Sequence, residues 1–306
     1  MVDFVKLKDS GEESDIKEKR KSKISFKKIL LIALFFFFLS SIITSLTYEF
    51  SPKLAVVPIK GPILTEKTST LYGSSISSRD ISNTLRELMD DDSVKAVLLD
   101  INSPGGSPVA SEEISNAIEE LKIKKSVYAL INDVGASGAF WIAVSADKIY
   151  SSSMSTVGSI GVTSAGLSFE NFIKEYNISY RKLTAGKYKD MGSIFRKPTE
   201  NESKLIQNIL NEVHENFISH VAKNRNLTYS QVKKYATGEI FLGSKAKEIG
   251  FIDEIGYYPN VISDLKKKVN NDDLMIVSYE EDPTLLEVLG VDALTNIFPK
   301  TLVSLQ

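Results

Sequence analysis

The sequence has no cysteine among its 306 residues and only two histidines, His214 and His220. The lack of cysteine excludes disulfides, thiolate nucleophiles, iron–sulfur clusters and zinc sites with cysteine ligands. Two histidines offer little to a multi-histidine metal centre or to a histidine-based triad. Neither sign of charge dominates, since 37 Lys and Arg stand against 39 Asp and Glu, whereas a nucleic-acid-binding protein is usually more basic. We therefore expect no nucleic acid partner, and nothing in the sequence indicates a metal or an organic cofactor.

Charged residues are also missing from Ile29–Leu46, which at about 1.5 Å per residue is long enough to span about 27 Å of a membrane. Lysines are frequent before this run, and Lys53 alone follows it closely. Because basic residues tend to stay on the cytoplasmic side, we predict a single-pass anchor in the cytoplasmic membrane over residues 29–47. A disordered basic tail (residues 1–28) would then be cytoplasmic, and the rest of the chain extracytoplasmic. A cleaved signal peptide and a buried core helix are the alternatives; the long basic segment and the lack of a small-x-small cleavage site favour the anchor.

Alternating strands and helices are predicted after the apolar run. Val94–Ile101 and Ser126–Ile131 are nearly continuous apolar runs of strand length, as expected of strands buried on both faces of a parallel sheet. Each leads through a glycine-containing turn into a predicted helix, which indicates an α/β domain over residues 53–269. A strand is predicted over Thr156–Thr163, and a long helix over Thr199–Asn224 with apolar residues at every fourth position. Residues 270–306 are assigned to an amphipathic tail whose role stays open.

The two glycine-containing turns are the candidates for a chemical site, because functional groups gather at the carboxyl ends of parallel strands. In the second turn, Gly135-Ala136-Ser137-Gly138, Ser137 lies where a strand leads into a helix, with a glycine on either side. These glycines permit unusual backbone angles and leave room for a substrate. The first turn contains Gly105-Gly106, and the amides of Gly106 and Gly138 could together bind an oxyanion. The alternatives are that Ser137 is a simple helix N-cap and that Gly106 belongs to a plain tight turn.

A serine nucleophile needs a base. Both histidines lie on the predicted long helix, six residues apart and pointing in different directions, so we expect them to be surface or cap residues. A lysine can serve as the base only when neutral, which requires a buried, apolar site because its ordinary pKa is about 10.4. The segment 186–190 contains Lys187 and Lys189, and the residue pattern alone does not choose between them.

Five motifs occur in order along the sequence: Asp100-Ile101-Asn102-Ser103-Pro104-Gly105-Gly106, Ala136-Ser137-Gly138 followed by an aromatic pair, Thr156-Val157-Gly158-Ser159-Ile160-Gly161-Val162, Gly186-Lys187-Tyr188-Lys189-Asp190, and the spaced set Gly238, Gly243, Ala246, Gly250 and Asp253. Through these motifs the sequence resembles, over roughly Leu54–Leu265, the signal peptide peptidase A type of membrane-anchored serine proteases of bacteria and archaea, in its half-length form. The resemblance implies the ββα superhelix of the crotonase and Clp-protease type, and a serine endopeptidase with a Ser-Lys dyad over residues 53–269.

The resemblance also implies roles for individual residues. Ser137 matches the nucleophile, and Lys189 matches the general base, while the other lysine of the segment is less well placed. Ser159 matches a serine that hydrogen-bonds the base and orients its amine. Gly106 and Gly138 match the amides of the oxyanion hole.

The same resemblance implies peptide substrates, above all signal peptides left after secretion, and a ring-like homo-octamer at the membrane whose adjacent protomers share each dyad. One departure is Ala139-Phe140-Trp141, where many relatives carry a glycine and tyrosines; it concerns the shape of the pocket rather than the chemistry. The alternatives are a related membrane protease that cuts a specific partner protein, a crotonase-like acyl-CoA enzyme, and a non-catalytic scaffold. An exported site disfavours the acyl-CoA enzyme, because CoA esters are cytoplasmic.

Overall fold

The computed structural model describes residues 26–70 and 73–280, and the chain divides into two compact units between Phe50 and Ser51. The first unit contains one helix, α1 (Phe26–Phe50). Within the described ranges, no helix has both the length and the apolar character that a membrane span requires. The anchor over residues 29–47 therefore stays a prediction. Most of the predicted basic tail, residues 1–25, lies outside the described residues.

The second unit is built on an eight-stranded sheet, which confirms the predicted α/β class. Its main path runs in the order β10-β9-β7-β6-β1-β12, and β8 pairs with both β7 and β11. All of these pairs are parallel except β9 with β10. The strands of this sheet are β1 (Lys53–Lys60), β6 (Val94–Ser103), β7 (Ser126–Ala136), β8 (Lys148–Ser151), β9 (Thr156–Gly158), β10 (Ile240–Leu242), β11 (Glu254–Ile255) and β12 (Met275–Ser278).

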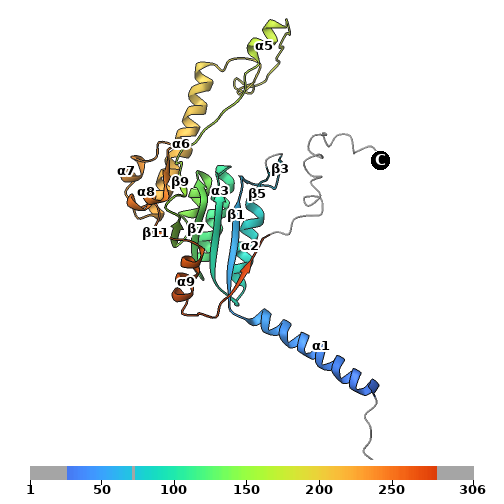
Figure 1. Cartoon of the computed structure of the whole chain (residues 1–306). Helices are drawn as coiled ribbons and strands as arrows, with labels where there is room; N and C mark the ends of the chain where they lie inside the picture. The colour runs from blue at the N-terminus through green and yellow to red at the C-terminus, as the bar shows by residue number, and fades with distance from the viewer. Residues whose placement is uncertain (1–25, 71–72, 281–306) are drawn as a thin grey trace, which may run out of the picture. The chain divides into compact units, whose positions relative to one another are not determined.

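Short strand pairs and helices complete this unit (Figure 1). The short pairs are β2 (Ile63–Leu64) with β5 (Ile76–Ser77), and β3 (Ser69–Thr70) with β4 (Gly73–Ser74). The helices are α2 (Ser78–Asp90), α3 (Pro108–Lys122), α4 (Gly138–Ala143), α5 (Glu170–Glu175), α6 (Glu200–Asn224), α7 (Tyr229–Lys233), α8 (Gly243–Glu248) and α9 (Tyr258–Lys268).

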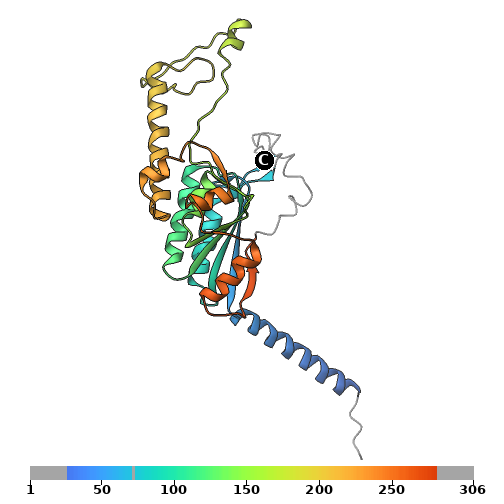
Figure 2. The same ribbon diagram turned by 60° about the vertical axis from the view of Figure 1, so that its left-hand side comes forward.

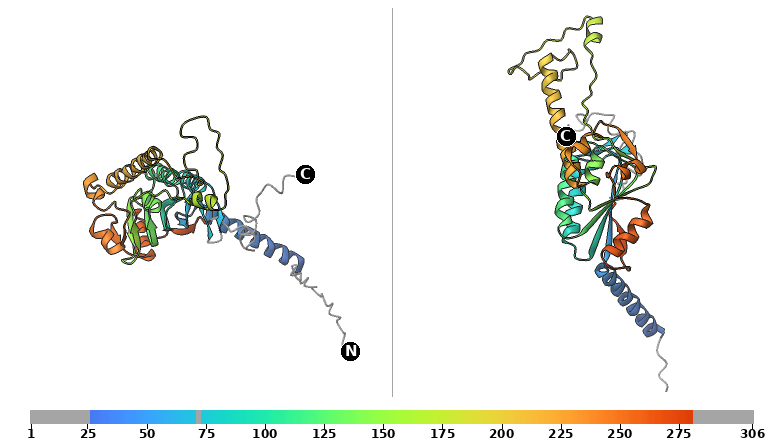
Figure 3. Two further views of the ribbon diagram at one scale, coloured as in Figure 1. Left: turned by 90° about the horizontal axis from the view of Figure 1, so that it is seen from above. Right: turned by 90° about the vertical axis from the view of Figure 1, so that its left-hand side faces the viewer.

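Both faces of the central strands are buried, and this explains why their sequences are nearly continuous runs of apolar residues. Successive side chains of a strand point to opposite faces. Thus Leu99 of β6 packs in the cluster that contains residues of α2 and α3, whereas its neighbour Leu98 packs in the cluster that contains Leu265 of α9. Figure 3 shows the sheet between these two helical layers, with α9 in orange-red.

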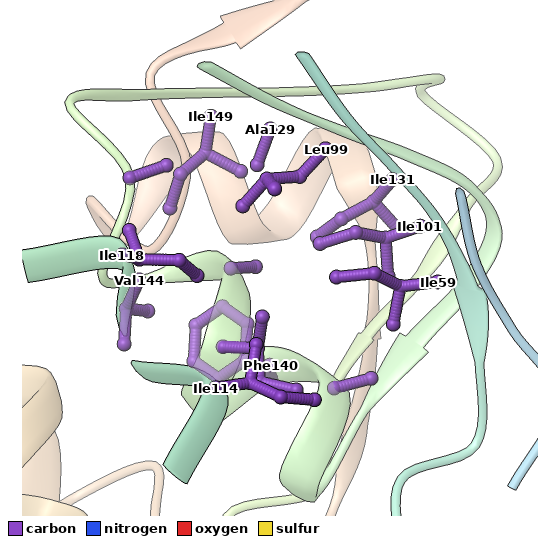
Figure 4. Packing of buried hydrophobic residues seen from close by; sticks show 14 of the residues in the cluster. Ile59, Leu99, Ile101, Ile114, Ile118, Ala129, Ile131, Phe140, Val144 and Ile149 are labelled. Atoms are coloured by element: carbon purple, nitrogen blue, oxygen red, sulfur yellow. The ribbon is translucent and has the colours of Figure 1, made fainter. Parts of the chain in front are cut away.

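The helix that follows Ser137 is anchored in the larger of these clusters. Phe140 of α4 is fully buried, and its ring lies 5.5 Å from that of Phe251. Figure 4 shows the Phe140 ring beside Ile114 and Val144, below the row of strand side chains. This burial holds the start of α4, and therefore Ser137, at the carboxyl end of β7.

A long excursion leaves the sheet between β9 and α6. Figures 1 and 2 show residues 164–199, which we call the arm, extending away from the sheet past the N-terminal end of α6. Apart from the capping residue Glu202, the buried residues of α6 lie in its C-terminal half, from Phe217 to Ala222. Leu205 and Ile209, in the N-terminal half, are 38% and 57% exposed. The predicted apolar stripe of this helix is therefore buried along only part of its length.

Three boundaries differ from those predicted. β7 continues to Ala136, and the strand predicted over Thr156–Thr163 ends at Gly158, because Gly158 and Ser159 adopt φ of 101° and 54° and turn the chain out of the sheet. At the other edge of the sheet, β12 pairs with β1, so the sheet extends beyond residue 269, where we expected the domain to end. The rest of the predicted C-terminal tail, residues 281–306, lies outside the described residues.

Candidate active site

Ser137 occupies a strained bend between β7 and α4. Its backbone has φ 53° and ψ −124°, and its amide donates a hydrogen bond of 2.8 Å to the Gly158 carbonyl. A non-glycine residue in such a conformation costs about 1–3 kcal/mol and is most often found at functional sites. Although Ser137 precedes the helix, its side chain makes no capping hydrogen bond. The N-cap alternative therefore does not account for this serine, and its hydroxyl is available for chemistry.

The two glycine turns are pressed against each other. A Cβ atom on Gly138 would lie 3.2 Å from the Gly106 amide nitrogen, and one on Gly105 would lie 2.6 Å from the Gly138 nitrogen. Gly106 forms a parallel bridge with Ile63, whose amide donates to the Gly105 carbonyl and whose carbonyl accepts from the Ser107 amide. A Cβ on Gly106 would lie 2.0 Å from the Ile63 carbonyl oxygen, so only glycine fits here.

The amides of Gly106 and Gly138 are suited to bind an anion together. In the bridge with Ile63 the neighbours of Gly106 make the hydrogen bonds, so the Gly106 N–H points to the opposite side. The Gly138 N–H lies in the first turn of α4, where it has no intrahelical acceptor. Both glycines line the same cleft as Ser137. Two such donors beside a serine hydroxyl can stabilise the oxyanion formed when that hydroxyl attacks a carbonyl.

Gly138→Ala should lower activity through a steric clash, because the new Cβ would lie 2.3 Å from Ser111 Oγ. Alanine keeps the backbone N–H, so the loss would come from displacement of that donor, and we expect roughly a 10²-fold fall in kcat/KM. Adding Ser111→Ala removes the clashing oxygen, and the closest remaining contacts of the new Cβ are 3.2 Å to the Gly106 nitrogen and 3.4 Å to the Cβ of residue 111, so the double variant should recover part of the activity. Peptide hydrolysis by both variants, with Ser111→Ala alone as the control, measures this. A double variant no better than Gly138→Ala would contradict the explanation.

Ser159 lies in the same cleft as Ser137, at the end of β9. Its amide donates a hydrogen bond of 2.8 Å to the Glu239 carbonyl, which fixes the positive φ of 54°. The cleft has a volume of about 530 Å³ and lies between the two turns, the residues after Ser159 and one face of α6. No Asp, Glu, Lys or Arg is among the described residues that line it. Four of the five predicted site residues, all except Lys189, are thus brought together.

The two histidines are not the surface residues that we expected. His214 lines the cleft with Ser137. His220 is packed behind α4: its ring stacks on Trp141 at 4.3 Å and 8°, and Nε2–H donates to the Trp141 carbonyl at 3.1 Å. Its Nε2 also lies 3.2 Å from Ser145 Oγ. Residue 220 lies about one helical turn after Phe217 and one turn before Asn224, so the three residues lie on the same side of the helix. The spacing from the apolar Phe217 was the feature of the sequence that could have identified His220 as partly buried.

His220 should make stability depend on pH. Burial lowers its pKa below the usual value of 6.5, so the folded state resists the protonation that the unfolded chain accepts. The contribution of neutral His220 is complete above about pH 6.5 and is lost as the pH falls below that value. We expect the free energy of unfolding, measured in urea between about pH 5 and pH 8, to fall on the acid side. His220→Gln, which does not titrate, should show a weaker dependence; an unchanged pH dependence would contradict this role.

Lys189 does not line the Ser137 cleft. It lies exposed in the arm, beside a separate shallow cavity that Tyr180, Asp190 and Phe195 also line. Lys187 is absent from the cleft as well, and its amine lies 5.1 Å from the centre of the Tyr188 ring. Within one chain, the structure therefore does not join either lysine to the nucleophile.

The residue after Lys189 is held by a network of ion pairs. Asp190 accepts hydrogen bonds from Tyr180, Lys182 and Arg196, and these donors lower the pKa of its carboxyl group. Arg196 also donates two hydrogen bonds, of 2.7 and 2.9 Å, to Glu202 in the first turn of α6. The Arg196 pair and the Thr199 amide lower the pKa of Glu202 to about 2. This network connects the segment around Lys189 to the N-terminal end of α6.

Comparison with known proteins identifies the family. The model of peptidase family S49 matches residues 119–272. A protein of Enterococcus faecium named "Putative signal peptide peptidase SppA" is 33% identical over 234 residues, which cover 76% of this chain and 68% of that protein. Protease 4 of Haemophilus influenzae is 34% identical over 226 residues, 73% of this chain but 36% of that protein. The chloroplastic serine protease SPPA of Arabidopsis thaliana is 26% identical over 247 residues, 76% of this chain and 36% of that protein. The chain belongs to peptidase family S49, as its resemblance to the signal peptide peptidase A type proteases predicted.

Proposed function

We propose that the protein is a serine endopeptidase in which Ser137 is the nucleophile and Lys189 is the general base. The observation that carries this proposal is the bend at Ser137, whose side chain has no capping role. The amides of Gly106 and Gly138 are packed beside it, in a cleft whose described lining residues include no Asp, Glu, Lys or Arg. The membership of peptidase family S49 supports the same conclusion.

Each residue has one task in the proposed reaction. Ser137 Oγ attacks the carbonyl carbon of the scissile bond while its proton passes to the neutral amine of Lys189, which Ser159 orients. The amides of Gly106 and Gly138 bind the resulting oxyanion, and each such donor is worth about 2.7–4 kcal/mol. Protonated Lys189 then gives its proton to the leaving amine as the C–N bond breaks. A water molecule attacks the acyl-enzyme in the same way and releases the carboxylic acid product and free Ser137.

We propose that Lys189 acts on the Ser137 of a neighbouring copy, in a ring-like homo-octamer. The position of Lys189 in the arm, outside the cleft of its own chain, supports this. The arm also exposes many large apolar side chains, and an exposed apolar surface often marks an interface with another protein. Those side chains belong to Leu167, Phe169, Phe172, Tyr176, Ile178, Tyr180, Leu183, Tyr188, Ile194 and Phe195. A second copy that covers them would also shield the Lys189 amine from water, which favours its neutral form.

We further propose that residues 29–47 anchor the protein in the cytoplasmic membrane, with the N-terminus inside, the catalytic unit outside, and remnant signal peptides as substrates. The support is the uncharged run Ile29–Leu46 and the exposure of large apolar side chains between Leu30 and Leu39. The full chain should stay with membranes in alkaline carbonate, and deletion of residues 1–50 should release it. Release of the full chain by carbonate would refute the anchor.

The proposed activity can be tested by covalent labelling. The parallel sheet with helices on both faces is the arrangement expected of the ββα superhelix that we assign to this chain, and crotonases share that fold, so the fold alone does not separate a peptidase from an acyl-CoA enzyme. A serine-directed phosphonate should modify Ser137 in the full chain, as peptide mass spectrometry would show. An acyl-CoA enzyme or a scaffold would leave Ser137 unmodified.

A further inference from the structure

Arg196, in the arm, uses every hydrogen-bond donor of its guanidinium group. Its Nε–H donates to the Asp190 carboxylate at 2.5 Å, and an Nη2–H donates to the Asp190 backbone carbonyl at 2.7 Å. Two further N–H groups donate to the two carboxylate oxygens of Glu202, at 2.7 and 2.9 Å, and the last donates to the Lys197 carbonyl at 3.1 Å. Arginine carries five such donors in one fixed plane, so a lysine could not make the same set of bonds.

These bonds connect the residue after Lys189 to the first turn of α6. Glu202 is the third residue of that helix, and its carboxylate also accepts a hydrogen bond of 2.7 Å from the Thr199 amide, as part of a capping box. The C-terminal half of α6 is buried in the larger hydrophobic cluster. Arg196 therefore joins the backbone of the Lys189 segment to a helix whose other end is fixed in the core.

Hardly any residue of the arm is buried. Among residues 164–199, all of which the structure describes, Ile173 alone is buried. The ion pairs of Arg196 are better shielded, because the Asp190 and Glu202 side chains are only 11% and 4% exposed. Exposed ion pairs contribute little, but arginine–carboxylate pairs with two parallel bonds are strong and directional. Lys189 is itself exposed, so its position is set by the backbone that these pairs hold.

We propose that Arg196 is a positioning residue: it fixes the backbone beside Lys189 at the N-terminal end of α6, so that the Lys189 amine reaches the Ser137 of a neighbouring copy. A general base must lie within hydrogen-bond reach of the proton that it takes, and a displacement of about 1 Å can cost about 10²-fold in rate. Arg196 lies outside the Ser137 cleft of its own chain and acts through Asp190. This inference rests on the proposed dyad shared between copies.

Steady-state kinetics of the full chain in detergent, on a quenched fluorescent peptide, tests the effect on the reaction. Arg196→Ala should lower kcat about 10²-fold and leave KM within about twofold, because the residues that line the cleft are unaltered. Arg196→Lys keeps the charge but offers fewer donors, so it should recover only part of the loss. Glu202→Gln keeps an oxygen for the cap but removes the ion pair, and it should also lower kcat. Arg86→Ala, which removes an exposed pair with Glu120 on another surface, should change neither constant.

Mixed assemblies show which half of the shared site Arg196 serves. Arg196→Ala still supplies Ser137, and Ser137→Ala supplies a correctly held Lys189, so the two variants reassembled together should regain up to about a quarter of the wild-type activity. Arg196→Ala mixed with Lys189→Ala should gain nothing, since neither variant supplies a positioned base. A general loss of stability would not distinguish between these two partners. If Arg196→Ala does not enter the assembly, Arg196→Lys and Glu202→Gln take its place in the same mixtures.

A mixture of Ser137→Ala with Lys189→Ala separates this inference from the function on which it rests. If that mixture regains activity while Arg196→Ala and Glu202→Gln keep kcat within about threefold of the wild type, the positioning role is refuted and the shared dyad stands. The same conclusion follows if Arg196→Ala regains activity with Lys189→Ala, or with neither partner. If the mixture of Ser137→Ala with Lys189→Ala regains none, the shared dyad fails, and the role of Arg196 fails with it.

Discussion

Ser137→Ala should abolish peptide hydrolysis, with kcat/KM reduced roughly 10⁴- to 10⁶-fold. The substitution removes the only atom that can form the acyl-enzyme at this bend. Alanine has a Cβ, as serine does, and is strained to the same degree at φ 53°, while the serine hydroxyl makes no capping bond that would be lost. The thermal stability and the oligomeric state should therefore stay close to those of the wild type. Steady-state kinetics on a quenched fluorescent peptide measures the loss.

Ser203→Ala is the matched control, because Ser203 lies exposed on α6, outside the cleft. It should keep full activity and full labelling by the phosphonate. If Ser137→Ala kept more than about a hundredth of the wild-type activity, Ser137 could not be the nucleophile. Another serine of the cleft would then have to be considered, with Ser159 the first candidate.

Lys189→Ala should be as inactive as Ser137→Ala, and a mixture of the two variants should regain activity. Each variant supplies the group that the other lacks, provided that each site takes its serine and its lysine from different copies. Random assembly into a closed ring gives intact pairs at up to about a quarter of the sites. The measurement is peptide hydrolysis after the two purified variants are dissociated together and reassembled.

Lys187→Ala is the control for this experiment, because Lys187 lies two residues away in the same segment and outside the cleft. It should retain activity. No regain in a mixture that demonstrably contains both variants in one assembly would contradict a shared dyad. It would indicate instead that the arm folds back so that Lys189 reaches the Ser137 of its own chain.

Much of the fold could be predicted because the central strands are buried on both faces, and their mostly apolar composition reflects this burial. Val94–Ile101 lies within β6 and Ser126–Ile131 within β7, and they were recognisable because a strand covered on both faces is apolar at most of its positions. Sequence motifs also identified Ser137, Ser159, Gly106 and Gly138, and the structure brings these four residues to one cleft. They are close because the carboxyl ends of neighbouring parallel strands meet at one edge of the sheet.

The burial of other residues could not be predicted from the sequence, because it depends on which helices pack against each other. The sequence predicted a surface or cap position for His220, but α6 packs on α4, and the His220 ring contacts Trp141 and Ser145. The apolar pattern of α6 is the same along the whole helix, yet Leu205 and Ile209 are exposed while Phe217 is buried. Periodicity shows which face of a helix is apolar, but not whether a partner covers that face.

The sequence by itself determined the α/β class, the central strands β6 and β7, and the two glycine turns with their serine. These features follow from local composition and from backbone angles that few residues adopt. Only the tertiary structure decided that Gly106 and Gly138 line the same cleft as Ser137 and that Lys189 lies outside it. Those facts concern distances between residues far apart in the chain, and such distances are set by the packing of whole helices and strands.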